Sequence, residues 1–398
     1  MSRLLAPGSH RAAGVADDAA LVAALLRVEV AWSRALVVAG LADAAAAEAV
    51  ERAAAGLRPD LAGLLVDTEA AANPVVPLVV LLRKAVGDGA PIHRGLTSQD
   101  VLDTALVLLA RDALGRVGDD LAATAGRLAG LARTHRDTVM AGRTLTQHAV
   151  ATTFGLKVAQ RMAAVDDAAD AVGEVRGALP VQYGGAAGTR ALLVHLAPDA
   201  DPDAVPSTFA DALGLRPDLP WHTRRGVVTG TGDVLVTATD ALGALANDVL
   251  LLGRPEIGEV SEGAAPGRGG SSTMPHKRNP VLAVLVRAAA LQAPQLAAQL
   301  HLAAASGVDE RPDGAWHAEW PAFARLLELT VTAASQAREL VDGLEVDAAA
   351  MAARADASAE ALLAESGGHG DVRDHLGEAG AVVDALVARH DAQAAARG

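Results

Sequence analysis

A glycine-rich stretch in the second half of the chain places a serine, a lysine and an asparagine close together. It runs from Gly267 to Pro280 and reads GRGGSSTMPHKRNP. Three glycines in four residues give a backbone that can move and can turn its N–H groups inward. Ser271 supplies a candidate nucleophile or base, Lys277 a cation and Asn279 a hydrogen-bond donor. A nucleophile or base, a cation and a donor on a mobile backbone indicate a loop that carries chemistry.

Two other loop types and a plain linker are the alternatives for this stretch. A phosphate-binding GxxxxGK[ST] loop does not fit, because Lys277 does not follow a glycine. Ser271 does not stand in the G-x-S-x-G pattern of a nucleophile elbow. A disordered glycine linker does not explain the dense polar and charged groups and the two prolines that follow the glycines.

Two more polar segments stand ahead of helical patterns. The first is HRGLTSQD, residues 93–100, in which Thr97 and Asp100 resemble a capping box. It is either an ordinary helix start or, with its free N–H groups, a site for a carboxylate. The second is GRTLTQHA, residues 142–149, which is expected to place several donors at one helix entrance. His148 in it is either an acid, base or donor, or a side chain that satisfies local backbone groups.

Long segments rich in Ala, Leu and Val carry Arg, Asp and Glu at intervals of three and four, which predicts an all-α fold. Helices of about 25 residues usually lie side by side in a bundle. Because alanine-rich faces offer little large apolar surface, burial between subunits is expected to add stability. The helical patterns cover residues 17–56, 98–135, 150–178, 226–253, 280–305 and 321–341.

Prolines and glycines divide the chain into three expected regions. Pro74, Pro77 and the GDGAP stretch at 87–91 end the first region, and Asp342-Gly343 ends the second. The regions are 1–91, 92–342 and 343–398. Residues 179–188 and the five-proline stretch 197–220 are predicted connections within the central region.

Composition excludes several classes of protein. The net charge of −14 opposes binding to nucleic acid, and the absence of cysteine excludes a disulfide scaffold. No uninterrupted apolar stretch reaches the roughly 20 residues of a bilayer span. Residues 1–18 lack the apolar core of a secretory signal, so we expect a cytoplasmic protein without a membrane helix.

Together the three polar segments resemble the signature regions of the fumarase/aspartase superfamily, in the expected order. GSSTMPHKRNP is similar to its signature loop, and HRGLTSQDVLDTAL and RTLTQHAVATTFGLK to the other two. LPVQYGGAAGT, PWHTRR and GAWHAEWP are most similar to the branch that lactonises 3-carboxy-cis,cis-muconate in protocatechuate breakdown, the β-ketoadipate pathway. The similarity runs from about residue 15 to 350.

The resemblance implies an all-α, three-region subunit that assembles as a homotetramer, with each active site built from segments of different subunits. It implies proton transfer by Ser271, a cation at Lys277 and acid chemistry or substrate orientation at His148. No metal and no organic cofactor are expected, and the partner is a small tricarboxylate substrate. The residues expected to bind that substrate are Arg94, Thr97, Ser98, Gln99, Thr144, Gln147, Ser272, Met274 and Asn279.

One departure from the superfamily bears on the reaction. Many members carry a glutamate five residues after the loop asparagine, as the partner of the histidine, and this chain has Val284 there. Loss of water or an amine needs a tuned acid, whereas a carboxylate is already a stable anion near its pKa of about 4. The sequence therefore favours cycloisomerisation over adenylosuccinate lyase-type elimination, with a noncatalytic structural relative as the remaining alternative.

Overall fold

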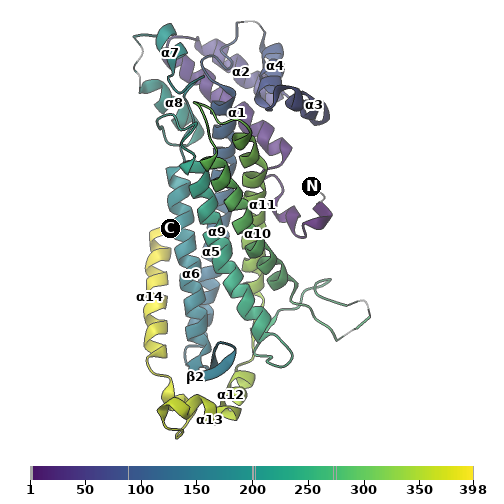
Figure 1. The fold of residues 1–398 in the computed structure, drawn as a ribbon, viewed down its shortest axis with the longest axis vertical. Helices are drawn as coiled ribbons and strands as arrows, with labels where there is room; N and C mark the ends of the chain where they lie inside the picture. Colours follow the sequence, from purple (N-terminus) through teal and green to yellow (C-terminus); the bar gives the residue numbers. More distant parts are fainter. Residues whose placement is uncertain are drawn as a thin grey trace.

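The computed structural model describes residues 3–87, 89–199, 201, 203–271, 273–274 and 276–397, and it shows an elongated, mostly helical subunit (Figure 1). Five long helices run along its length and pack against one another. Four of them begin and end close to the predicted ranges, which confirms the all-α prediction; the fifth, α11, begins at Gly314 and keeps Pro321 within the helix. The five are α5 (Ser98–Thr134), α6 (Phe154–Ala178), α9 (Gly226–Leu252), α10 (Val281–Ala305) and α11 (Gly314–Asp342).

Shorter helices cover one end of the bundle (Figure 1). The predicted helical stretch 17–56 is in fact two helices, because Gly40 has a φ of +69° and Asp43 caps a new helix by accepting the Ala46 N–H. The elements are the 3₁₀ turns η1 (Arg3–Leu5) and η2 (Ser9–Ala12), with α1 (Asp18–Val38), α2 (Ala44–Gly56), α3 (Leu61–Ala71) and α4 (Val75–Val86).

The proline-rich stretch 197–220 is not wholly a connection. It contains α8 (Ala204–Leu213), and α7 (Ala191–Leu196) ends just before it. The prediction was wrong here because Pro206 lies in the first turn of α8, where a helix needs no N–H from that residue.

The opposite end of the bundle carries a β-hairpin and most of the C-terminal region (Figure 1). The antiparallel strands β1 (Val139–Thr144) and β2 (Gln147–Thr153) occupy the stretch from which a helix was predicted to begin at residue 150. A second two-stranded ribbon joins β3 (Val260–Glu262) to β4 (Leu344–Val346). The remaining elements are α12 (Ala348–Ala357), α13 (Ala359–Leu363), η3 (Ala364–Ser366), η4 (Val372–His375) and α14 (Ala379–Arg397).

One large apolar core connects the helices of the bundle with α1 and α4. A smaller core joins the hairpin to the C-terminal region through Val139, Ala141 and Ala151 on one side and Ala355, Leu362, Leu363 and Val372 on the other. The three-region division at 91/92 and 342/343 stays a proposal. The end of α11 at Asp342 and the separate C-terminal core support it.

Two described helices, α9 and α10, meet a length and composition test for crossing a membrane. Neither is an uninterrupted apolar stretch, because isolated polar residues interrupt sequences whose average is still apolar. Core helices of soluble proteins pass the same test, and both helices pack against α11 and against each other.

Candidate active site

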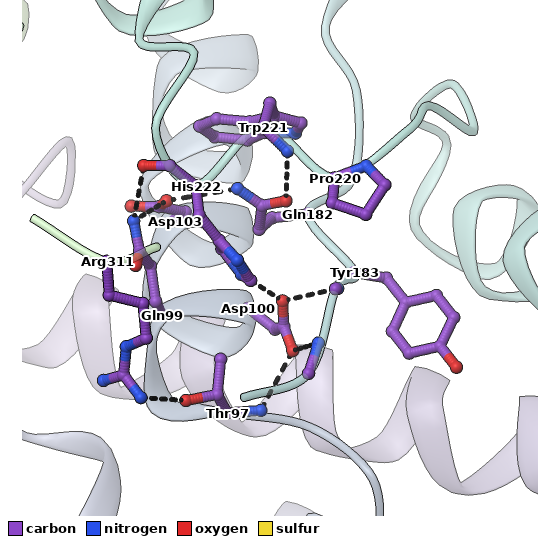
Figure 2. A network of polar contacts seen from close by, with 12 residues as sticks. Thr97, Gln99, Asp100, Asp103, Gln182, Tyr183, Pro220, Trp221, His222 and Arg311 are labelled. Carbon is purple, nitrogen blue, oxygen red and sulfur yellow. Dashed lines mark hydrogen bonds and ion pairs between the residues drawn. The ribbon is translucent and has the colours of Figure 1, made fainter. Parts of the chain in front are cut away.

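Asp100, on the first turn of α5, lies fully buried where three segments meet (Figure 2). Its Oδ2 accepts the backbone N–H groups of Thr97 and Gly185, each at 2.9 Å. Its Oδ1 accepts the N–H of Gly184 at 2.8 Å and lies 2.7 Å from Nε2 of His222. The contact to Thr97 completes the predicted capping box. One carboxylate thus holds the start of α5 to the 179–190 loop and to the loop before α9.

Asp103, one turn further along α5, connects this helix to α9 and α11. Its carboxylate accepts hydrogen bonds from Arg225, at 2.7 and 3.1 Å, and from the indole N–H of Trp316 at 2.9 Å. Arg225 also binds Glu319 of α11 at 2.6 Å, and all three charged groups are buried. Burial raises the pKa of Glu319; it opposes the charge on Arg225 as well, but the two carboxylates outweigh it and raise the pKa of the guanidinium.

The turn before α5 is held by α1. Both the backbone N–H and Nδ1 of His93 contact Glu29, at 2.9 and 2.7 Å, and Trp32 donates its indole N–H to the Arg94 carbonyl at 2.9 Å. His93 has a φ of +59°, a strained value that these contacts maintain. The guanidinium of Arg94 is exposed and donates to the Leu41 carbonyl at 3.2 Å. The side chains of His93 and Arg94 are thus engaged by Glu29 and by the Leu41 carbonyl.

The predicted substrate contacts at the start of α5 fall into two groups. Thr97 is buried with its hydroxyl 2.7 Å from the guanidinium of Arg311, which donates to it, and Ser98 is half-buried beside it (Figure 2). Gln99 points inward instead, where its amide donates to Asp103 at 3.2 Å and to the His222 carbonyl at 3.0 Å. In a single chain Gln99 thus has a structural role.

Four polar atoms near this end are buried without a hydrogen-bond partner among the described residues: Oε1 of Gln99, Nδ1 of His222, the hydroxyl of Tyr183 and Nε1 of Trp320. Burial raises the pKa of the Tyr183 phenol, and the guanidinium of Arg190 lies 4.7 Å from the centre of its ring.

The second signature segment forms the tip of the β1–β2 hairpin. Thr144, Gln147 and His148 are all exposed there, on strands and not at a helix entrance, because α6 begins only at Phe154 with Thr153 as its cap. Leu145 and Thr146 at the turn both have positive φ values, and the Leu145 side chain is 95% exposed.

The third segment forms a loop that extends sideways from the bundle between α9 and α10 (Figure 1). Its base is fixed: Asn279 donates both its backbone N–H and its side-chain amide to the Gly269 carbonyl, at 2.9 and 3.0 Å. Glu262 caps α10 through the Leu282 N–H at 3.0 Å and pairs with Arg268 at 3.3 Å.

Beyond this base the described side chains of the loop are exposed or half-buried. Ser271 Oγ accepts the Met274 N–H at 3.2 Å, while Met274 and Lys277 are exposed. Ser272 lies outside the described residues.

The first and second segments do not meet within one chain. α5 has 37 residues, so about 55 Å of helix separates Ser98 from the hairpin that carries His148. The roles predicted for the site residues stay predictions.

Sequence reasoning missed His222 and Arg311. His222 stands in PWHTRR, a stretch noted only for its resemblance, and its contact with Asp100 joins residues 122 positions apart. Arg311 lies in the α10–α11 connection, 214 positions from Thr97. Neither pairing leaves a local signal in the sequence.

Within the described ranges no group of three His, Cys, Asp or Glu side chains is arranged to hold a metal ion.

Comparison with known proteins agrees with this architecture. A lyase family model matches residues 14–294, and the chain belongs to that family, within the fumarase/aspartase superfamily.

Two relatives are similar to this chain in sequence, and one solved structure is similar to it in fold. The chain is 46% identical to nitrosuccinate lyase of Streptomyces davaonensis over 358 residues, covering 88% of this chain and 75% of the relative. It is 38% identical to 3-carboxy-cis,cis-muconate cycloisomerase of Bradyrhizobium diazoefficiens over 375 residues, covering 92% and 82%. The crystal structure of 3-carboxy-cis,cis-muconate lactonizing enzyme from Pseudomonas putida superposes with a TM-score of 0.86 at 32% identity, covering 95% and 96% of the two chains.

The contacts of Asp100 predict that the Asp100→Asn substitution lowers both the stability and the activity of the protein. Each carboxylate oxygen receives two donors, so an amide group must face at least one N–H. We expect a loss of about 1–3 kcal/mol in the free energy of unfolding, and a fall in kcat/KM of up to about 10²-fold as the start of α5 shifts. Urea unfolding at fixed protein concentration and steady-state kinetics measure the two effects.

The matched control is Asp112→Asn, an exposed carboxylate on the same helix that pairs with Arg111. It should change stability by less than about 1 kcal/mol. Equal effects of the two substitutions would show that the buried contacts of Asp100 do not fix the start of α5.

Proposed function

We propose that this enzyme cyclises 3-carboxy-cis,cis-muconate to a carboxymuconolactone, in the cytoplasmic breakdown of protocatechuate. The observation that separates this reaction from loss of water or an amine is Val284, which occupies the position of the glutamate that usually pairs with the histidine. The overlap with 3-carboxy-cis,cis-muconate lactonizing enzyme over 95% of this chain, at a TM-score of 0.86, supports the choice of substrate. An enzyme of this family without that pair is suited to a reaction whose attacking or departing group is a stable anion.

In the proposed reaction one carboxylate of the triacid adds to a double bond conjugated with a second carboxylate. A C–O bond forms, and the electron pair of the double bond moves into the second carboxylate, which becomes an enediolate with two negative charges. Lys277 and backbone N–H groups stabilise that dianion. A proton delivered by Ser271 to the α-carbon completes the lactone, and His148 orients the substrate by donating a hydrogen bond.

Elimination of nitrite from nitrosuccinate is the second candidate, and the 46% identity to nitrosuccinate lyase favours it. There a base removes the proton next to one carboxylate, and the resulting enediolate expels nitrite to leave fumarate. Nitrite, like a carboxylate, departs as a stable anion without a protonated histidine. Val284 thus supports both reactions and disfavours adenylosuccinate lyase-type elimination.

Assembly into a homotetramer with shared sites is part of the proposal. The length of α5 between Thr97 and His148 supports it, as does the exposed Leu145 at the hairpin tip. A further supporting feature is the apolar outer face of α10, where Val284, Leu291 and Leu302 are 50%, 69% and 65% exposed.

A direct assay separates the two reactions. We expect the enzyme to abolish the ultraviolet absorption of 3-carboxy-cis,cis-muconate without added nucleotide or metal, and to release little nitrite from nitrosuccinate. Ultraviolet spectroscopy follows the first reaction and colorimetric nitrite determination the second. Rapid nitrite release with no loss of the muconate absorption would replace the first candidate by the second.

Substitutions at the proposed catalytic residues should lower kcat by different factors. Ser271→Ala and Lys277→Met should each lower kcat by at least about 10²–10³-fold, because they remove the proton carrier and a charge that stabilises the dianion. His148→Gln keeps a donor and should cost about tenfold, against roughly 10²–10⁴ for a lost general acid. Steady-state kinetics on folded, assembled variants measure these effects. A His148→Gln variant as inactive as Ser271→Ala would make the histidine the proton donor.

Shared sites predict complementation between inactive variants. His148→Asn and Ser271→Ala alter different segments, so mixed assemblies should contain some sites with both residues intact. Activity should reappear after subunit exchange by mild denaturation and refolding. Each variant treated alone is the control, and failure of verified mixed assemblies to regain activity would place the whole site within one chain.

A further inference from the structure

The exposed face of His148 borders a cleft of about 560 Å³ that is rich in arginine. The hairpin contributes Arg143 and His148, the loop after α9 contributes Arg254 and Glu256, and α12 contributes Arg354. The cleft therefore joins the second signature segment to the C-terminal region, for which the sequence suggested no role.

The three arginines differ in how their charge is balanced. Arg143 forms a two-point ion pair with the fully buried Glu259, at 2.7 and 3.1 Å. Arg354 donates Nε to the Ile257 carbonyl at 2.5 Å, which leaves both of its Nη groups without a partner in the described ranges. The Arg254 side chain likewise has no partner there.

Acidic groups do not cancel these charges. Glu256 is the one acidic residue among the described residues that line the cleft, and Glu259 is committed to Arg143. Cationic charge is thus in excess beside His148. Two guanidinium groups with free N–H groups are suited to two carboxylates, since each can bind one in a two-point contact.

Packing holds Arg354 in place. Its neighbour Ala355 is fully buried in the small core that joins α12 to the hairpin. The Asp347 N–H, at the start of α12, donates to the Glu259 carbonyl at 3.0 Å. Both contacts tie α12 to the segments that carry Arg143 and Arg254, so the backbone that carries Arg354 is positioned before a ligand arrives.

We propose that Arg254 and Arg354 bind two carboxylates of the substrate beside His148, so that the C-terminal region forms one wall of the active site. This inference rests on the proposed function, because it assigns cations to the substrate's carboxylates. It requires only that the ligand be a small polycarboxylate, whichever of the two candidate reactions follows.

The test is the binding of succinate, a dicarboxylate with no double bond or leaving group to react. Isothermal titration calorimetry on the assembled enzyme should show saturable binding. The double variant Arg254→Gln/Arg354→Gln should bind succinate at least about tenfold more weakly, since two charge-assisted contacts are lost. Arg254→Lys/Arg354→Lys keeps the charge and should lose less. Arg373→Gln, an exposed C-terminal arginine paired with Asp356, is the control and should bind like the wild type.

Several results would overturn the proposal. The first is the absence of saturable succinate binding to the wild-type enzyme. The second is an unchanged affinity for succinate in a double variant whose circular dichroism and gel filtration match the wild type. If that variant does not assemble, Arg354→Gln alone provides the test. The third is binding of inorganic phosphate as tight as that of succinate, with the same loss of affinity in the variants. That result would overturn the assignment to carboxylates and indicate a general anion site. Because succinate is not turned over, these results stand apart from the activity assays that test the proposed function.

Discussion

Two buried carboxylates on consecutive turns of α5 are the constraint on which one end of the molecule depends. Asp100 accepts four donors from three segments, and Asp103 joins α5 to Arg225 and Trp316. A buried charge is costly unless it is fully hydrogen-bonded, so these contacts strongly favour one arrangement of the surrounding loops. The start of α5, with Thr97 and Ser98, is positioned as a result.

The same helix that is fixed at one end carries the hairpin at the other. Because α5 is 37 residues long and continuous, it acts as a rigid spacer between the first and second signature segments. Under the proposed function, a site that uses both segments is completed by other copies of the chain. The apolar face of α10 and the bare Leu145 side chain are surfaces that such an assembly would bury.

Within a shared fold, the reaction depends on small differences in charge. In this chain the histidine of the second segment faces arginines, with Glu256 as the one described acidic lining residue of its cleft. A cationic surrounding stabilises anionic substrates and anionic leaving groups alike, which fits both the cycloisomerase and the nitrosuccinate lyase relatives.

The sequence by itself determined the long helices, the capping box at Thr97 and the family, because helical periodicity and the three signature segments are local patterns. It did not reveal the β1–β2 hairpin, whose strands depend on packing against the C-terminal region, or α8, whose early proline looked like a break. Only the tertiary structure decided that Gln99 points inward, that His222 contacts Asp100 and that Arg354 and His148 line one cleft. Those contacts join residues more than 100 positions apart, and hydrogen-bond geometry and charge burial select them only when the chain is folded.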